Sequence, residues 1–490
     1  MDCSPDAAYN RFSVTTSTNE AGLCTECRNV RIIRSDRGSV FYLCQLAAAD
    51  PRFPKYPSLP VRDCPGFQPA AVEPPYPSRA YAWYVVAVLA AILMFSFIDR
   101  QIMNLLVAPI RRDLDISDTG ISLLIGFAFA IFYTLFGIPL GRLADHHNRR
   151  NIIAGGLVSW SLFTAGCGLA RNYWQLLLTR IGVGVGEASL SPSAYSLISD
   201  YFPPERRATA LSVYGMGIYV GAGVASLLGA AAIRMVDSWR TIFFLVGLPG
   251  AAFATILFTI REPVRRGASR QHTPLKEVFA CFKANRSTFL CHNLGVSLIA
   301  FSAYGAAAWQ PSYFIRTHHW TASEAGFVLG IVYALAGSAG VVAGGRLADY
   351  LRARGHRDAN MRVMRLAGMC AIPSCFIYIL ASDTRVTVPF LAAVVFAQAL
   401  PYGVAPAAIT QIVPNAMRGQ ATATYLFVNN LIGLGLGPTA MALMTDYVFR
   451  DDSQVRYSIL SVTVLACAAS SLILHRGLGH FRTSLKGQGL

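Results

Sequence analysis

The sequence predicts an all-α membrane protein with twelve transmembrane helices in two pseudo-symmetric six-helix bundles, preceded by a small cysteine-rich module. Three observations support this fold class. The 490 residues are 54% hydrophobic and only 14% charged, whereas about a quarter of a typical soluble domain is charged. Twelve apolar runs approach or exceed the ~20 residues that a bilayer-spanning helix needs. A repeated motif places six of these runs in each half of the chain.

The repeated motif is Gly141-Arg-Leu-Ala-Asp145, which recurs as Gly345-Arg-Leu-Ala-Asp349. Each copy closes an apolar run and is followed by basic residues. Downstream of each copy, a proline precedes an arginine at the same spacing, in the pairs Pro203 with Arg207 and Pro414 with Arg418. Two correspondences at similar separations indicate a unit that is built twice.

The predicted elements follow in chain order. A polar, Ser/Thr-rich N-terminus is expected to be disordered. The predicted segments are this N-terminus (1–23), a four-cysteine zinc-ribbon-like module (24–67), a Pro-rich linker (68–79), an N-terminal six-helix bundle (80–260), a basic cytoplasmic linker (261–286), a C-terminal six-helix bundle (287–476) and a cytoplasmic tail (477–490). The expected spans are 80–107, 119–141, 151–170, 172–199, 208–233, 241–260, 287–315, 325–345, 366–382, 386–413, 419–445 and 457–474. Glycines in 208–233 and 419–445 predict close helix packing.

The cysteine-rich module begins with a Cys-x-x-Cys pair, Cys24 and Cys27, and contains Cys44 and Cys64 further on. Such a pair puts two thiolates on one tight turn, and two more sulfurs can complete a tetrahedral zinc site. A segment of about 40 residues cannot bury a sufficient core alone, so a metal would supply folding energy. A disulfide pair and free thiols are the alternatives. The lack of an export signal and the predicted cytoplasmic position disfavour disulfides.

The net charge of +16 is concentrated in short loops rather than on a surface suited to nucleic acid. The richest basic segments are 146–150, 261–286 and 350–365, which lie on one side in a twelve-span topology. The positive-inside rule makes this side cytoplasmic and places both termini there. We expect a monomer in a bacterial inner membrane, in contact with membrane lipids. The opposite loops do contain basic residues, namely Arg111, Arg112, Arg316 and Arg450.

Four charged residues interrupt the spans: Asp99, Arg100, Arg180 and Glu187. Charges at membrane depth are costly, so inward-facing, functional positions are expected. Arg180 and Glu187 are seven residues apart and share one helix face, although contact would require both side chains to lean together. Asp99 is a second candidate partner for Arg180. Arg100 points about 100° away from Asp99 and is expected to contact packed helices or headgroups. A static ion pair that orients the helices is the alternative to proton coupling.

The stretch from Gly141 to Arg150 resembles the cytoplasmic motif of the major facilitator superfamily, with Asn148 in place of a glycine and His146 in place of a basic residue. Within this superfamily the chain is most similar to the Spinster-like branch, on residues 97–101, 182–192 and 304–311. The resemblance covers about residues 80–475. It implies the superfamily fold, and it matches Asp99 and Glu187 to acidic residues of the family.

The resemblance also implies that the two motif copies latch the halves shut on the cytoplasmic side. Asp145 would face the N-terminus of the eleventh span and Asp349 that of the fifth, where helix dipoles are positive. Asp200, with Arg142 and Arg207, would extend this network. A solvated turn without a switching role is the alternative. The predicted gating residues are Gly141, Arg142, Asp145, Arg149, Arg150, Asp200, Arg207, Gly345, Arg346, Asp349 and Arg418.

Polar and aromatic residues within the spans are candidates to line a substrate cavity. They are Tyr133, Tyr195, Tyr304, Trp309, Gln310, Gln398, Tyr402, Asn429 and Asn430. The alternative for each is that it satisfies a neighbouring backbone group. His292 has no charged neighbour on its own helix, and we expect a hydrogen-bonded core histidine there.

Together these features predict a secondary transporter that works by alternating access, with a small-molecule or lipid substrate bound near the midplane. The resemblance favours a lysophospholipid or sphingoid lipid. Proton coupling is expected to act through protonation of Glu187 or Asp99, which would release Arg180. The alternatives are a proton-linked carrier of small organic anions or drugs, and a receptor whose cysteine module binds a partner. No P-loop, nucleophile elbow or catalytic metal spacing occurs, so neither an enzyme nor a transport cofactor is expected.

Overall fold

The computed structural model describes residues 21–34, 39–68, 76–236, 238–265, 275–414 and 417–486. Each predicted segment has residues outside these ranges, namely 1–20 of the N-terminus, 35–38 of the cysteine module, 69–75 of the Pro-rich linker, 237 of the first bundle, 266–274 of the basic linker, 415–416 of the second bundle and 487–490 of the tail. The chain divides into two compact units, Met1–Pro75 and Tyr76–Leu490.

The small unit is built on an antiparallel hairpin of β1 (Val30–Arg34) and β2 (Val40–Cys44), in which Val30 pairs with Cys44. Two short 3₁₀ turns flank the hairpin, η2 (Leu23–Glu26) and η3 (Gln45–Ala48). Its core is small and sulfur-rich, comprising Ala21, Cys24, Cys27, Val30 and Cys44. A core of this size supplies little hydrophobic stabilisation.

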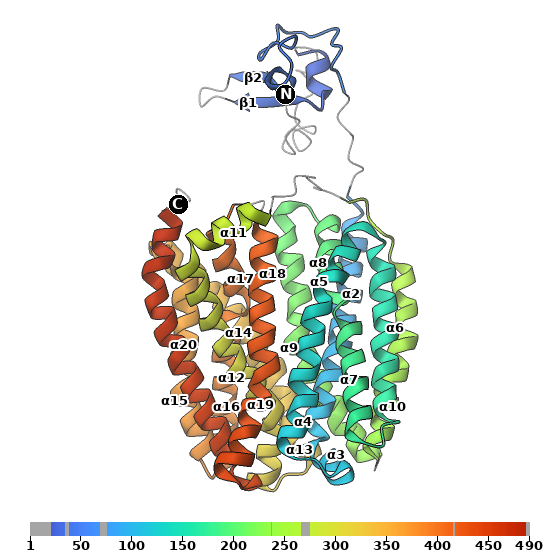
Figure 1. Cartoon of the computed structure of the whole chain (residues 1–490), viewed down its shortest axis with the longest axis vertical. Helices are drawn as coiled ribbons and strands as arrows, with labels where there is room; N and C mark the ends of the chain where they lie inside the picture. The colour runs from blue at the N-terminus through green and yellow to red at the C-terminus, as the bar shows by residue number, and fades with distance from the viewer. Residues whose placement is uncertain are drawn as a thin grey trace. The chain divides into compact units, whose positions relative to one another are not determined.

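The large unit is all-helical, and its two halves stand side by side in Figure 1. The first half contains α2 (Arg79–Leu105), α3 (Val107–Leu114), α4 (Asp118–Ser122), η4 (Leu123–Phe127), α5 (Ala128–His146), α6 (Arg149–Cys167), α7 (Tyr173–Glu187), α8 (Leu190–Tyr201), α9 (Pro204–Met235), α10 (Trp239–Phe253) and η5 (Ala254–Thr259). The second half contains α11 (Leu275–Ala284), α12 (Arg286–His318), α13 (Ala322–Val332), η6 (Tyr333–Gly337), α14 (Ser338–Ala353), α15 (Ala359–Leu380), α16 (Thr384–Ala399), α17 (Pro401–Gln411), α18 (Arg418–Asn429), η8 (Asn430–Leu436), α19 (Gly437–Leu443), η9 (Met444–Phe449), η10 (Asp452–Gln454) and α20 (Val455–Lys486).

Ten helices among the described residues are long and apolar enough to cross a membrane. The prediction of twelve spans also counted α6 and the α7–α8 pair, which are not among these ten. The fourth predicted span is split, because α7 ends at Glu187 and α8 begins at Leu190. Pro192 accounts for the break, since it has no N–H to donate to the carbonyl four residues earlier. The all-helical fold is confirmed, and the count of twelve stays a prediction.

The two halves meet along several helix pairs, including α9 with α13 and α5 with η8. A glycine pair makes the first of these approaches possible. A Cβ on Gly223 of α9 would lie 2.6 Å from the carbonyl oxygen of Gly330 on α13, and a Cβ on Gly330 would lie 2.8 Å from the carbonyl oxygen of Gly223. The close packing predicted from the glycines of 208–233 therefore includes a contact between the halves.

Candidate functional site

A buried ion pair joins the first and fourth predicted spans. Arg100 of α2 donates from Nε and Nη2 to Oε2 of Glu187 on α7, at 2.8 Å and 2.5 Å. The guanidinium also lies 5.0, 4.5 and 5.0 Å from the ring centroids of Phe97, Phe129 and Tyr133. Glu187 is 1% exposed. Because aromatic faces attract cations, these rings hold the guanidinium in a defined position.

This pair corrects two predictions. Arg180 was expected to pair with Glu187, and Arg100 was expected to contact packed helices or headgroups. Arg180 instead donates to two backbone carbonyls, Leu124 at 3.4 Å and Asp99 at 3.5 Å. The two helical turns between Arg180 and Glu187 separate them along α7, whereas α2 presents Arg100 directly to the carboxylate.

Asp99 is a carboxylate buried next to this ion pair. It is 1% exposed, and neither of its carboxylate oxygens has a hydrogen-bond partner among the described residues. Its charged neighbours are Glu187, Arg180 and Arg100, so all four intramembrane charges form one cluster. Orphaned polar groups of this kind are rare in folded proteins. Asp99 is therefore a functional candidate rather than a packing residue.

The four predicted cavity tyrosines lie beside this cluster or beside one another. Tyr133 and Tyr304 come from different halves, and both lie close enough to Arg100 to act on it electrostatically. Tyr402 of the second half has Tyr195 and Tyr304 as neighbours. The aromatic group is larger than predicted and also includes Tyr214, Tyr219 and Tyr425. Nothing in the sequence distinguishes these three from other tyrosines in apolar runs.

The other predicted cavity residues mostly bind protein neighbours. Trp309 donates to the carbonyl of Pro438 at 2.9 Å, and the Gln310 side chain accepts from Tyr333 at 2.5 Å. Gln398 donates to Ser302 at 3.0 Å. Two further polar residues differ in their hydrogen-bond partners. Asn429 is buried, and its Oδ1 has no partner among the described residues. His292 contacts Asn293 and the carbonyl of Ala405, each at 2.9 Å, as expected for a core histidine.

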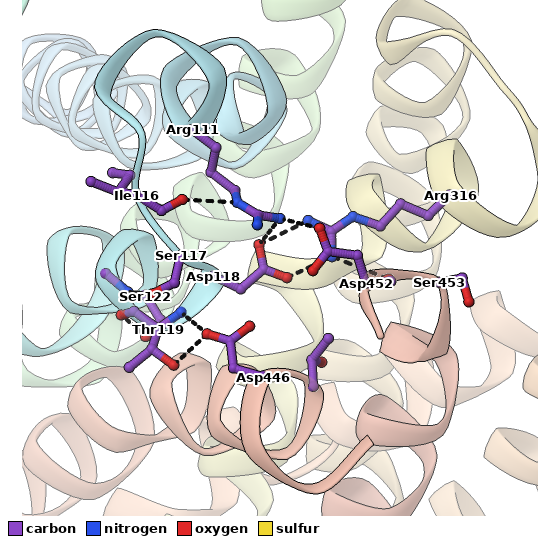
Figure 2. A network of polar contacts seen from close by, with 12 residues as sticks. Arg111, Ile116, Ser117, Asp118, Thr119, Ser122, Arg316, Asp446, Asp452 and Ser453 are labelled. Atoms are coloured by element: carbon purple, nitrogen blue, oxygen red, sulfur yellow. Dashed lines mark hydrogen bonds and ion pairs between the residues drawn. The ribbon is translucent and has the colours of Figure 1, made fainter. Parts of the chain in front are cut away.

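A second polar cluster joins the halves on the side opposite to the repeated motif (Figure 2). At its centre is Asp118 of α4, which is fully buried. Arg111 of the first half lies 2.8 Å from Asp118, and Arg316 of the second half approaches both carboxylate oxygens, at 2.5 and 2.8 Å. Asp452 completes the bridge by pairing with Arg111 at 2.7 Å.

A further bridge lies beside the first. Oδ2 of Asp446 accepts hydrogen bonds from the backbone N and the hydroxyl of Thr119, at 2.7 and 2.6 Å. Because Thr119 lies in the first turn of α4, the carboxylate also faces the positive end of the helix dipole. Figure 2 shows both bridges side by side. Together they close the molecule on this side, which is the predicted extracytoplasmic face.

This network is not among the features predicted from the sequence, where Arg111 and Arg316 stand out only as exceptions to the charge asymmetry of the loops. Acidic residues do lie near Arg111 and Arg450 in the sequence, at 113–118 and 446–452, but nothing in the sequence indicates which arginine each acid contacts. Bidentate arginine–carboxylate pairs add both strength and geometric specificity to such a contact.

Two motif residues on the other face, Arg149 and Asp349, have their ion pairs within their own halves. Arg149 is buried and pairs with Asp200 at 2.5 Å and with Glu262 at 2.6 Å, all within the first half. Asp349 is 78% exposed at its side chain, and its ion pair is with Arg352 of the same helix, at 3.4 Å. The side chain of Asp145 lies outside the described part of the structure.

Other gating candidates are spread over the same face. The backbone N of Arg150 donates to Glu262 at 3.2 Å, and Arg418 donates to the carbonyl of Thr410 at 3.1 Å. Arg346 lines a pocket of about 630 Å³ between α9 of the first half and α14 and α16 of the second. Arg142 is exposed and Arg207 is half-buried. The predicted latch between the halves stays a prediction.

The small unit brings its four predicted metal ligands together. Cys24, Cys27 and Cys44 are buried, Cys64 is half-buried, and none of the four is joined in a disulfide. Burial and then the neighbouring Cys27, Cys64 and Cys44 raise the pKa of the Cys24 thiol to about 11. Such crowding of thiols fits a soft divalent metal, whose charge would favour the thiolates. Among the described residues, however, only Asp118, Asp446 and Asp452 bring three possible ligand atoms within 4.8 Å of one another. No three of the four cysteine sulfurs lie that close to one another.

Comparisons with known proteins agree with this architecture. The Major Facilitator Superfamily profile matches residues 89–438. An MFS-type efflux pump of Mycolicibacterium smegmatis is 31% identical over 379 residues, which cover 76% of this chain and 86% of the relative. Protein spinster homolog 1 of Mus musculus is 27% identical, covering 81% of this chain and 78% of the relative. A solved bacterial homolog of the human lysosomal transporter Spinster, inward-facing and unoccupied, matches with a TM-score of 0.68 and 28% identity, over 84% of this chain and 98% of that structure.

Proposed function

Since the chain belongs to the major facilitator superfamily of membrane transporters, in its Spinster-like branch, we propose that it moves an amphipathic anion by proton-coupled alternating access. The observation that carries this proposal is the buried Arg100–Glu187 pair, with Tyr133 and Tyr304 of the two halves beside it. A lysophospholipid or sphingoid-like lipid is the favoured substrate class. An anionic headgroup suits a buried guanidinium, and aromatic walls suit the apolar part of such a molecule.

In the proposed coupling, a substrate anion replaces Glu187 as the partner of Arg100. While Glu187 is ionised, it holds Arg100 through two charge-assisted hydrogen bonds. Protonation of Glu187 removes its negative charge, so Arg100 becomes available to a substrate anion. Arg180 was first expected to be the released cation. Its carbonyl contacts make it a positioning residue that holds α2, η4 and α7 together.

A second candidate is a proton-linked carrier of small organic anions or drugs. It is favoured by the relatives, which include the MFS-type efflux pump and a probable L-galactonate transporter of Escherichia coli that is 27% identical over 315 residues. The same buried arginine would serve a carboxylate as well as a phosphate. Competition of a lysolipid against an organic acid for binding to the purified protein separates the two substrate classes.

The test of coupling is Glu187→Gln in proteoliposomes that carry a pH gradient. The variant is expected to bind substrate but to lose uptake driven by the gradient, because its side chain no longer titrates. Glu277→Gln is the matched control, since Glu277 is an exposed acid of α11. Undiminished gradient-driven uptake by Glu187→Gln would contradict the proposal.

We also propose that the small unit binds a structural zinc ion through Cys24, Cys27, Cys44 and Cys64. Zinc would draw these sulfurs in to the ~2.3 Å Zn–S distance and stabilise a unit whose own core is small. Metal analysis of the full-length protein is expected to find about one zinc per chain. Cys44→Ala should lose it, and Cys370→Ala, at an exposed thiol of α15, should retain it. Equal zinc content in the two variants would rule this site out.

We further infer a monomer in a bacterial inner membrane with both termini in the cytoplasm. The basic character of segments 146–150, 261–286 and 350–365 supports the position of the termini. A phosphatase fused after Leu490 is expected to be inactive, because this reporter folds only outside the cytoplasm. An active fusion would invert the topology.

A further inference from the structure

A basic pocket lies in the second half, away from the central charge cluster. Its volume is about 350 Å³, and it forms where the loop between α14 and α15 meets the C-terminal end of α20. Four cationic side chains and one carboxylate line it. The lining residues are Gly355, His356, Arg357, Asp358, Arg362, Arg482, Leu485 and Lys486.

The single acid of the pocket holds two of the arginines in place. Asp358 is 1% exposed, and it accepts from Nε of Arg362 at 2.8 Å and from Nε and Nη2 of Arg482 at 2.8 and 2.6 Å. No other side-chain hydrogen bond of these two arginines is found within the described ranges. The carboxylate thus orients the guanidiniums and leaves part of each planar donor set available. Arg357 and Lys486 add cationic charge that Asp358 does not neutralise.

Helix lengths place this pocket at the level of lipid headgroups. α15 has 22 residues, which span about 33 Å, close to the ~30 Å hydrocarbon core. Its first residue, Ala359, is therefore at one edge of the bilayer. α20 has 32 residues and is about 48 Å long, so its C-terminal turns extend beyond that edge. Gly355 turns the chain back between the helices, with a φ of +85° that favours glycine.

We propose that this pocket binds the phosphate of an anionic phospholipid headgroup on the predicted cytoplasmic leaflet. Basic pockets beside transmembrane helices at the headgroup level suit such lipids, since a phosphate finds several donors there while the acyl chains stay in the bilayer. Leu485 also lines the pocket. The lipid would tie the start of α15 to the end of α20 and is not a transported substrate. A free phosphate ion shares the headgroup chemistry but lacks the apolar anchor.

The experiment measures binding to the full-length protein in detergent by native mass spectrometry and by the shift of its melting temperature. The probes are phosphatidylglycerol, phosphatidylcholine and inorganic phosphate at equal phosphate concentration. Phosphatidylglycerol is expected to bind and stabilise the protein, with little effect of the other two. Arg357→Gln with Lys486→Gln should weaken phosphatidylglycerol binding about fivefold for each charge removed.

The matched control removes two basic residues from the same elements outside the pocket, Arg354→Gln with Arg476→Gln. Both side chains are exposed. This control should bind phosphatidylglycerol as the unmodified protein does. Equal weakening in both double variants would reduce the effect to general surface charge and overturn the site. Equal stabilisation by phosphatidylcholine would also overturn it. Equal stabilisation by inorganic phosphate would show that the pocket binds a free anion rather than a lipid.

Discussion

At the scale of single residues, the ion pairs of this protein differ in what they can do. Arg100 and Glu187 join α2 and α7 within the membrane-spanning part of the first half, and removing either partner leaves an unpaired charge there at a cost of about 3–5 kcal/mol. Asp358 holds two arginines within one half and outside the bilayer core. The Arg100–Glu187 pair is suited to switching, whereas Asp358 and its two arginines are suited to stabilising the fold.

Asp358 predicts a dependence of stability on pH. Although burial opposes ionisation, the hydrogen bonds and charges of Arg482 and Arg362 hold the pKa of Asp358 below its usual range. A lowered folded-state pKa contributes stability that is present above the usual aspartate pKa of about 3.9 and is lost as pH falls through the folded-state value. The melting temperature should therefore fall on acidification. In Asp358→Asn it should be lower at neutral pH and depend less on pH, and an identical pH profile would contradict this role.

At the scale of elements, the glycine contact between α9 and α13 sets how closely the two halves approach. Neither Gly223 nor Gly330 can carry a side chain without displacing backbone of the other half. Pro192 acts in another way, since it splits the fourth predicted span just after Glu187. The break frees the end of α7 from a continuous hydrogen-bonded ladder at the residue that is proposed to titrate.

Gly330→Val is expected to reduce transport at least tenfold, because the added methyl groups would separate α9 from α13. Gly155→Val is the control, since a Cβ at Gly155 of α6 meets nothing within 4 Å. Both variants should be compared for uptake per folded protein, with folding judged by gel filtration. Full activity in Gly330→Val would show that the halves do not need this approach.

The predictable part of the structure rests on local chemistry. Helices, the duplication and the four intramembrane charges follow from apolar runs, a repeated motif and the cost of burying charge. The partner of Glu187 does not follow from the sequence, because Arg100 and Arg180 are equally acceptable to it until the packing of α2 against its neighbours is known. Asp118 was missed for the same reason. A single loop acid carries no signal until Arg111 and Arg316 are brought to it from different halves.

At the scale of the whole molecule, ion pairs join the two halves on one face. On the other face, the ion pairs of the motif residues Arg149 and Asp349 lie within one half. Asp118 lies between arginines of both halves, and Asp446 and Asp452 add contacts from the second half. The opposite face has a pocket between α9 and α14.

Asp118→Asn is expected to shift the population toward states that are open on the predicted extracytoplasmic face. The change leaves two arginines without their shared carboxylate, so the closed state loses an attraction and gains a repulsion. Spin labels at Asp115 and Arg450, measured by pulsed electron paramagnetic resonance, should report longer distances. Asp383→Asn is the control, because Asp383 bonds within its own half, to the backbone of Arg385. An unchanged distance distribution in Asp118→Asn would count against a gate here.

The composition of the central cluster has an electrical consequence. With Asp99, Arg100, Arg180 and Glu187 all ionised, the cluster carries no net charge, so the empty carrier can reorient without moving charge through the membrane field. One bound proton makes the cluster positive, at about 2.3 kcal/mol for each charge carried across 100 mV. An anion bound at Arg100 would cancel that excess. Under the proposed coupling, voltage therefore acts mainly on the protonated carrier without substrate and holds it facing the negative side of the membrane until an anion binds.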